Sequence, residues 1–134
     1  MESFKHSRTD EDPPSEDRKF RRELSSGITA LALLGILDGA SVPLYGYSIA
    51  KRMEETGDGA RIVKHGTLYP VLRSLEGSGL LESTVEPSVS GPPRRYYGIT
   101  AAGREALGRW KRIWEETSAF IGGLIGGGQD DQGN

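Results

Sequence analysis

The chain has 134 residues, no cysteine, two histidines and a formal net charge of −2. This length suits a single domain with short tails, and the absence of cysteine excludes both a disulfide framework and a thiolate metal site. Two histidines, one of them in a polar N-terminal stretch, argue against a histidine-based metal site or catalytic triad, and no apolar run approaches the length of a membrane span.

The first 17 residues are polar and contain Asp10-Glu11-Asp12 and Pro13-Pro14. Because they lack apolar periodicity, we expect a disordered tail. Residues 18–24 could add a helical turn or two, and Ser25-Ser26 offers an N-cap for a strongly apolar helix. That helix should end at Asp38-Gly39 and be buried, because apolar residues recur along it at intervals of three: Ile28, Leu31, Leu34 and Leu37.

A loop that contains Pro43 leads to a second helix, predicted from about Tyr45 to Thr56, with Ile49 and Met53 on one face. Gly57 is well placed to end this helix. Residues 61–63 are short and β-prone, and the third helix follows them.

The third helix, over residues 64–76, is the segment with the clearest functional pattern. Leu68, Leu72 and Leu75 recur at i, i+4 and i+7, so they share a face that points to a core. Because Pro70 lacks an N–H, it suits only the first turn, and the helix should begin near Gly66 or Thr67, with Thr67 as its cap. Five residues then face away from the core: Thr67, Tyr69, Pro70, Arg73 and Ser74.

A hairpin is predicted after the third helix. From Leu80 to Glu86, Leu81, Ser83 and Val85 alternate with polar residues, as in a half-buried strand. Residues 87–93, with three prolines and a glycine, form a turn, and residues 94–99 form the return strand. Three helices followed by such a hairpin give the winged helix-turn-helix layout, with the hairpin as the wing.

Thr100 is predicted to cap a long final helix. Leu107, Trp114 and Ile121 are spaced by seven residues, and a second set with the same spacing, offset by three, consists of Trp110, Thr117 and Leu124. This a/d seam needs a partner. The first helix of the domain can cover some of its surface, and a second copy of the chain is the simpler way to cover the rest.

The predicted fold is therefore α+β and mostly α. It comprises a winged helix-turn-helix of three helices and a two-stranded wing over residues 18–99 and a dimerisation helix over residues 100–125. Disordered or flexible tails are expected over residues 1–17 and 126–134.

Five segments resemble the PadR family of bacterial and archaeal transcriptional regulators. They are Gly66-Thr67-Leu68-Tyr69-Pro70, Leu72-Arg73-Ser74-Leu75-Glu76, Gly79-Leu80-Leu81-Glu82, Gly91-Pro92-Pro93-Arg94-Arg95-Tyr96-Tyr97 and Thr100-Ala101-Ala102-Gly103. Leu44-Tyr45-Gly46-Tyr47 also resembles the segment that opens the second helix in that family, and the single terminal helix points to its short subfamily. The resemblance implies a homodimer that binds operator DNA, usually as a repressor, and that an effector releases.

Eight residues are the candidates for DNA contact. On the third helix, Tyr69 and Arg73 suit phosphate oxygens and base edges, although Arg73 could instead pair with Glu76 or Glu54. Arg94 and Arg95 alternate in the return strand, so only one should face the DNA, and we favour Arg94. The full set is Tyr45, Lys64, His65, Thr67, Tyr69, Arg73, Arg94 and Arg95. Tyr97 and Tyr96 should likewise split between core and solvent, and Tyr47 could pack in the core.

The seam residues Leu107, Trp110, Trp114 and Ile121 are the candidates for a dimer interface or an effector pocket. Dimer core is the simpler interpretation of the two tryptophans. The alternative, which the resemblance supports, is that Trp114 stacks a flat aromatic effector in a cavity between the terminal helices.

Three classes of function are candidates for this chain. The first is a cytoplasmic, homodimeric, DNA-binding repressor without a cofactor. In its favour, residues 60–100 contain five basic and three acidic residues, which gives the presumed DNA face a mild positive excess. The second is a winged-helix module that binds a protein or ligand but not DNA, which the acidic overall balance fits better. An enzyme finds little support, because there is no phosphate-cradling glycine motif and no carboxylate or histidine cluster with catalytic spacing.

Overall fold

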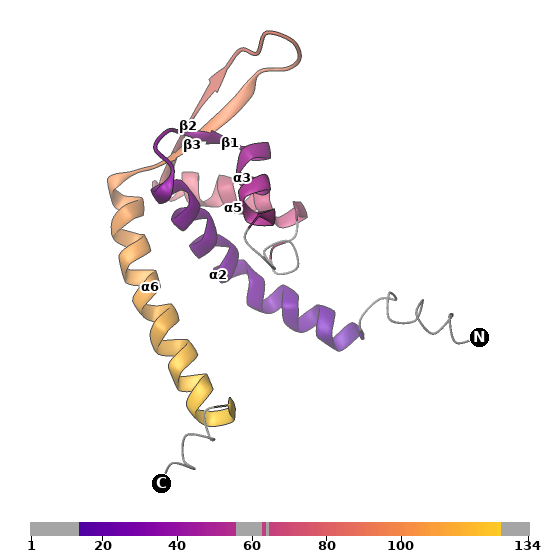
Figure 1. Cartoon of the computed structure of the whole chain (residues 1–134), viewed down its shortest axis with the longest axis vertical. Helices are drawn as coiled ribbons and strands as arrows, with labels where there is room; N and C mark the ends of the chain where they lie inside the picture. The colour runs from indigo at the N-terminus through magenta and orange to yellow at the C-terminus, as the bar shows by residue number, and fades with distance from the viewer. Residues whose placement is uncertain (1–13, 56–62, 64, 127–134) are drawn as a thin grey trace, which may run out of the picture.

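The computed structural model describes residues 14–55, 63 and 65–126. Its helices are α2 (Ser15–Gly39), α3 (Gly46–Glu54), α5 (His65–Gly77) and α6 (Ala101–Ile121), and the short π-helix η1 (Gly122–Gly126) follows α6. Its strands are β1 (Leu44–Tyr45), β2 (Leu81–Glu86) and β3 (Arg94–Ile99). The mostly helical winged-helix fold predicted from the sequence is confirmed (Figure 1).

Helix α2 is one continuous helix of 25 residues, so the N-cap expected at Ser25-Ser26 was wrong. Ser25 lies inside the helix, where its hydroxyl donates to the carbonyl oxygen of Arg22 at 3.3 Å. No helix breaker separates residues 18–24 from the apolar segment, and Glu16 and Asp17 in the first turn complement the helix dipole. The helix therefore begins at Ser15, ahead of the expected extra turns.

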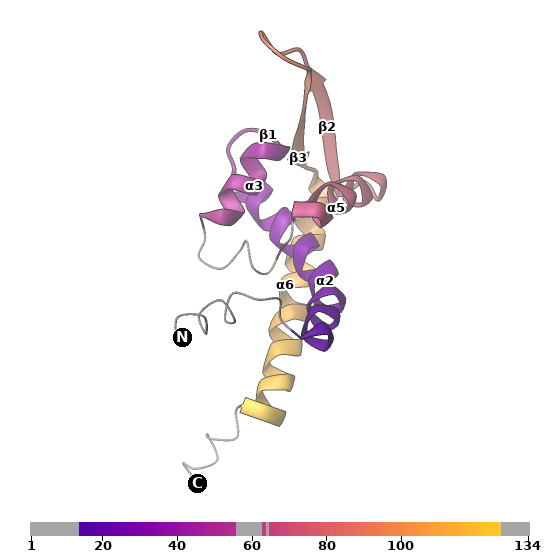
Figure 2. The same ribbon diagram turned by 90° about the vertical axis from the view of Figure 1, so that its right-hand side faces the viewer.

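The wing is part of a three-stranded antiparallel sheet with the order β1-β3-β2, rather than a two-stranded hairpin. Strands β2 and β3 pair from Leu81↔Ile99 to Glu86↔Arg94, and β1 adds the pair Leu44↔Tyr97 at the base. A two-residue strand carries no alternation that a sequence pattern could reveal. The distal part of the hairpin projects away from the helices (Figures 1 and 2).

The core lies between α2, α3, α5, the first turns of α6 and the base of the sheet. Leu68, Leu72 and Leu75 of α5 are at most 5% exposed, so the predicted leucine ridge is confirmed. Burying each such side chain contributes about 1.5–3 kcal/mol. The leucines therefore fix which face of α5 meets solvent.

The two junctions that flank the wing, between α5 and β2 and between β3 and α6, are fixed by local hydrogen bonds. The N–H of Gly79 (φ +80°) donates to the Glu76 carbonyl oxygen, and that of Leu80 to Leu75, each at 2.9 Å. These two bonds form a Schellman motif, which ends α5 and for which glycine is suited. Thr100 caps α6 as predicted, because its hydroxyl accepts from the Gly103 N–H at 3.0 Å.

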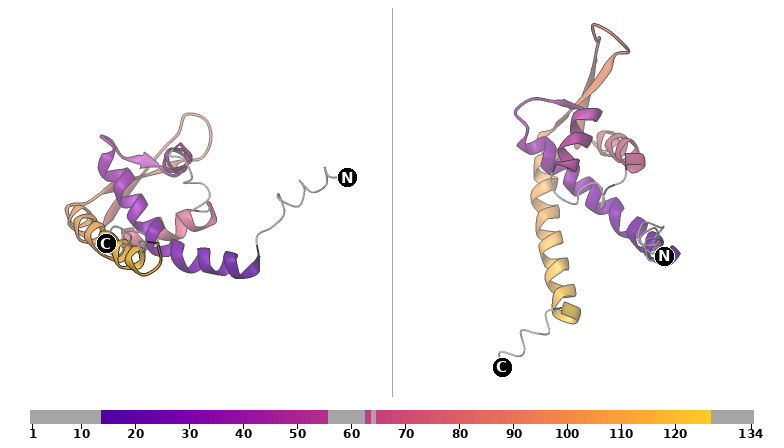
Figure 3. Two further views of the ribbon diagram at one scale, coloured as in Figure 1. Left: turned by 60° about the horizontal axis from the view of Figure 1, so that its bottom comes forward. Right: turned by 45° about the vertical axis from the view of Figure 1, so that its right-hand side comes forward.

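Helices α2 and α6 lie side by side near the sheet and diverge towards the N-terminal end of α2 (Figures 1 and 3). Within the described ranges, no helix is long and apolar enough to cross a membrane.

Candidate nucleic-acid interface

Helix α5 begins at His65, earlier than expected, so two details of the prediction were wrong. Thr67 is the third helical residue rather than the cap, and Pro70 lies beyond the first turn. A proline there forfeits the bond from its own nitrogen to the Gly66 carbonyl, a cost of about 3 kcal/mol. Burial of the leucine ridge offsets this cost.

The outward face of α5 carries the residues that the spacing predicts. Tyr69 is 45% exposed, and Thr67, Pro70, Arg73 and Ser74 are also exposed. Lys64, a further candidate, lies outside the described residues, as does the side chain of His65.

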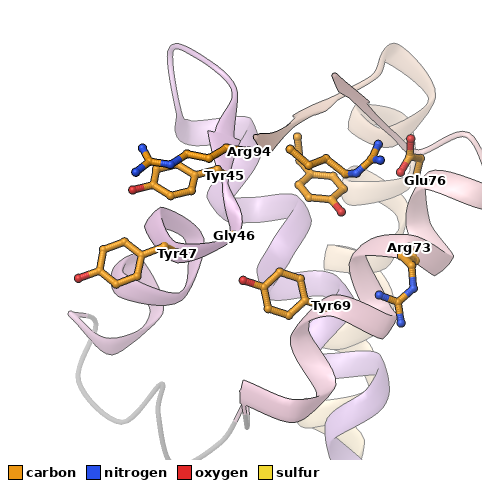
Figure 4. Close-up of a pocket in the computed structure, with 9 residues that line it drawn as sticks. Tyr45, Gly46, Tyr47, Tyr69, Arg73, Glu76 and Arg94 are labelled. Carbon is orange, nitrogen blue, oxygen red and sulfur yellow. The ribbon is translucent and has the colours of Figure 1, made fainter. Parts of the chain in front are cut away.

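A hollow of about 680 Å³ lies between α3, α5 and β3 (Figure 4). We call it the tyrosine–arginine hollow, after the residues that line it: Tyr45, Gly46, Tyr47, Tyr69, Arg73, Glu76, Arg94, Arg95 and Tyr97. The fold thus brings together five of the eight candidate residues, whereas Thr67 does not line the hollow. The sequence did not single out Gly46 or Glu76 as part of this site.

Gly46, the first residue of α3, makes room for Tyr69. A Cβ atom on Gly46 would come within 2.6 Å of Tyr69 Cε1 and collide with its hydroxyl oxygen. Figure 4 shows the Tyr69 hydroxyl directed towards Gly46. Contact across two helices therefore sets the orientation of this ring.

Tyr45 is the platform for the β3 residue Arg94. The Arg94 Cζ atom lies 4.6 Å from the centroid of the Tyr45 ring, a cation–π distance, and the Tyr96 ring lies 5.4 Å from Tyr45. Tyr47 is 61% exposed, so the core-packing alternative for it was wrong. Tyr97 is 4% exposed and Tyr96 is half-buried, as the strand alternation predicted.

Arg95 is held on the other side of the hollow. Its Nη1 atom donates to the Ser83 hydroxyl oxygen at 2.9 Å, and that hydroxyl donates to Glu76 Oε2 at 2.6 Å. Both arginines of β3 therefore line the hollow, although they lie on opposite faces of the strand. Both side chains reach the hollow because neighbouring elements approach the strand from both sides, and the number of them that contacts DNA stays a prediction.

The charge of the hollow is positive. Arg73, Arg94 and Arg95 contribute three guanidinium groups against the single carboxylate of Glu76. Within the described part of the chain no ion pair joins Arg73 to Glu76, and Figure 4 shows the Arg73 guanidinium directed away from that carboxylate. Burial raises the pKa of Tyr97 above 10.0, so its hydroxyl adds no negative charge at neutral pH. Such a surface suits an anion with several oxygen atoms.

A second concave surface, the α2–α6 groove, has a volume of about 380 Å³. It is lined by Leu24, Gly27, Ile28, Ala30, Leu31, Trp110, Ile113, Trp114 and Thr117. Trp114 is 45% exposed, whereas Trp110 is half-buried against the core. The first helix was expected to cover part of the α6 seam, and the groove agrees with this, but the sequence did not single out Ile113 or the α2 residues that line it. Among those α2 residues, Leu24, Ile28 and Leu31 share the i, i+4, i+7 spacing.

Of the other candidate interface residues, Leu107 packs against the core and Ile121 is 43% exposed. Among the described residues, no group of three or more histidine or carboxylate side chains could hold a metal ion.

In a comparison with known proteins, residues 33–109 match the transcriptional regulator PadR-like family. The transcriptional regulator Rv3488 of Mycobacterium tuberculosis is 43% identical over 72 residues, which are 54% of this chain and 64% of that protein. A PadR family transcriptional regulator of Eggerthella lenta has a similar solved structure, with a TM-score of 0.66 and 28% identity over 94% of this chain and 98% of that one. A PadR-like transcriptional regulator of Bacillus cereus gives a TM-score of 0.61 and 29% identity over 78% and 97% of the two chains.

Proposed function

Because the chain belongs to the PadR-like family of transcriptional regulators, we propose that it binds double-stranded operator DNA as a homodimer and represses transcription until a small molecule releases it. As a transcriptional regulator it is not an enzyme. The observation that carries the proposal is the tyrosine–arginine hollow, which joins the exposed face of α5 to the wing. Such a protein would act in the cytoplasm, where it meets the operator.

In the proposed complex, α5 enters the major groove. Arg73 is exposed there and reaches a guanine edge or a phosphate, while Tyr69 donates to a phosphate oxygen. Arg94 and Arg95, at the end of β3 that follows the turn of the wing, contact the adjacent backbone or minor groove. Lys64 precedes α5 in the sequence, and His65 and Thr67 belong to its first turn, where a helix N-terminus favours phosphate.

The proposed dimer forms through α6. Large apolar side chains along α6 and η1 are 43–78% exposed in the single chain: Ile113, Trp114, Phe120, Ile121, Leu124 and Ile125. An apolar surface of this kind marks an interaction site, and the two-fold symmetry of a dimer would present two copies of α5 to half-sites about one helical turn apart.

The α2–α6 groove supports the proposed effector. Its lining is almost wholly apolar and includes both tryptophans, on which a flat aromatic compound could stack. Such a compound would bind where α6 meets its partner, so that binding could alter the spacing of the two α5 helices.

The test begins with selection of bound sequences from a random DNA pool by the purified chain. On the enriched duplex, Arg73→Ala should weaken binding about tenfold in a shift assay, in line with the loss of one bidentate or phosphate contact. The matched control is Arg21→Ala, because Arg21 is an exposed arginine of α2 that does not line the hollow. Affinity should also fall steeply as salt is added.

Equal binding by the wild type and Arg73→Ala would remove Arg73 from the interface. Failure of the wild type to enrich any sequence at moderate salt would favour the alternative of a protein- or ligand-binding module, with which a net charge of −2 agrees.

A further inference from the structure

Three elements meet at the hydroxyl group of Ser83. Ser83 lies in β2 and donates to Glu76 Oε2 at 2.6 Å, near the end of α5. The same oxygen accepts from Arg95 Nη1 of β3 at 2.9 Å. We call this chain of two hydrogen bonds the Ser83 relay. Both bonds involve an ionised partner, which makes them stronger than bonds between neutral groups.

The register of the sheet explains why these side chains meet. Ser83 opposes Tyr97 and Val85 opposes Arg95, so Ser83 and Arg95 are diagonal neighbours on the face that carries the buried Tyr97. Arg94 lies on the opposite face, over Tyr45. The two arginines are therefore held by different elements, Arg95 through α5 and Arg94 through the residue that precedes α3.

The relay lies where the hydrophobic contact between wing and helices ends. Leu81 is 2% exposed, Ser83 is half-buried, and Val85 is already 52% exposed. Beyond Ser83 the side chains of β2 are exposed as far as the turn, and on β3 only Tyr96 is half-buried. The direction of the outer wing therefore depends on the Ser83 relay on one face of β3 and on the contacts of Arg94 and Tyr96 with the Tyr45 ring on the other face.

Glu76 also needs the relay for an electrostatic reason. Its carboxylate is half-buried and lies in a hollow that, in the proposed function, faces phosphate groups. An unpaired carboxylate there would repel DNA. The hydroxyl of Ser83 and, behind it, the guanidinium of Arg95 partly neutralise this charge, so that the carboxylate can serve as an anchor.

We propose that Glu76 and Ser83 are positioning residues, which hold Arg95 and the wing at a fixed offset from α5. The wing contact and the major-groove contact of a half-site must then lie at a set distance from each other. This inference rests on the proposed function, and it adds that the offset between α5 and the wing is set by a hydroxyl group that itself does not touch DNA.

The experiment compares two duplexes. The first is the duplex enriched by the wild-type chain from random DNA, and the second is the same duplex shortened, after footprinting, to remove the flanking base pairs that the wing protects. Ser83→Ala should weaken binding to the full duplex about tenfold and leave binding to the shortened duplex within about twofold of the wild-type value. Ser83→Thr keeps the hydroxyl and should restore the full-duplex affinity.

A charge-matched pair of variants separates positioning from general electrostatics. Glu76→Gln and Glu82→Gln each remove one negative charge, but Glu82 is exposed on the outer face of β2 and outside the hollow. Only Glu76→Gln should lower the ratio of full-duplex to shortened-duplex affinity. This pair also tests the proposal if Ser83→Ala does not fold, as judged by circular dichroism and thermal unfolding.

Equal losses on both duplexes, or no rescue by threonine, would overturn the positioning role and leave DNA binding intact. If the wild type enriches no duplex, the proposed function fails and the positioning role fails with it.

Discussion

Replacing Trp114 with alanine should separate the two copies of the proposed homodimer. In the single chain 45% of Trp114 is exposed, which for a side chain of ~250 Å² leaves ~110 Å² for a partner to cover. At about 25 cal/mol per Å², this burial stabilises the dimer by about 3 kcal/mol per copy and about 6 kcal/mol for the symmetric pair. This figure assumes that the partner covers all of the exposed area, so it is an upper bound, and we expect the dissociation constant to rise about a hundredfold, which corresponds to about 3 kcal/mol.

Sedimentation velocity over a range of concentrations measures this change. Arg112→Ala is the matched control, because Arg112 is exposed on α6 and lies about 200° around the helix from Trp114. The control should sediment as the wild type does. A wild-type chain that is monomeric at micromolar concentration, or a Trp114→Ala variant that dimerises normally, would refute the assignment of this face to a second copy.

Two further variants test the site and the core. Gly46→Ala should displace the Tyr69 ring and weaken binding to the enriched duplex about tenfold in a shift assay. The melting temperature should change little, because alanine suits a helix. Unchanged affinity would mean that DNA binding does not need this position of the ring. Thr29 is fully buried, and its hydroxyl has no hydrogen-bond partner among the described residues. Thr29→Val should therefore raise the free energy of unfolding by about 1 kcal/mol in urea titrations, and a destabilised valine variant would reveal a partner for that hydroxyl.

Local patterns determined most of the elements. The leucine spacing of α5 predicted its buried face, and with it the exposure of Tyr69 and Arg73. The turn residues 87–93 and the alternation on either side predicted the wing, and Thr100 predicted the start of α6. These features depend on residues within one or two turns of each other, so the sequence displays them directly.

The sequence could not determine features that depend on partners distant along the chain. Strand β1 exists because Leu44 and Tyr45 pair with β3, and α5 tolerates Pro70 beyond its first turn because core packing outweighs one lost hydrogen bond. The Gly46–Tyr69 contact, the Ser83 relay and the α2–α6 groove likewise join elements that only the folded chain brings together. The sequence alone thus specified which side chains α5 turns outward, whereas the tertiary structure decided which neighbours hold them, because a helix face follows from local periodicity and a contact between elements does not.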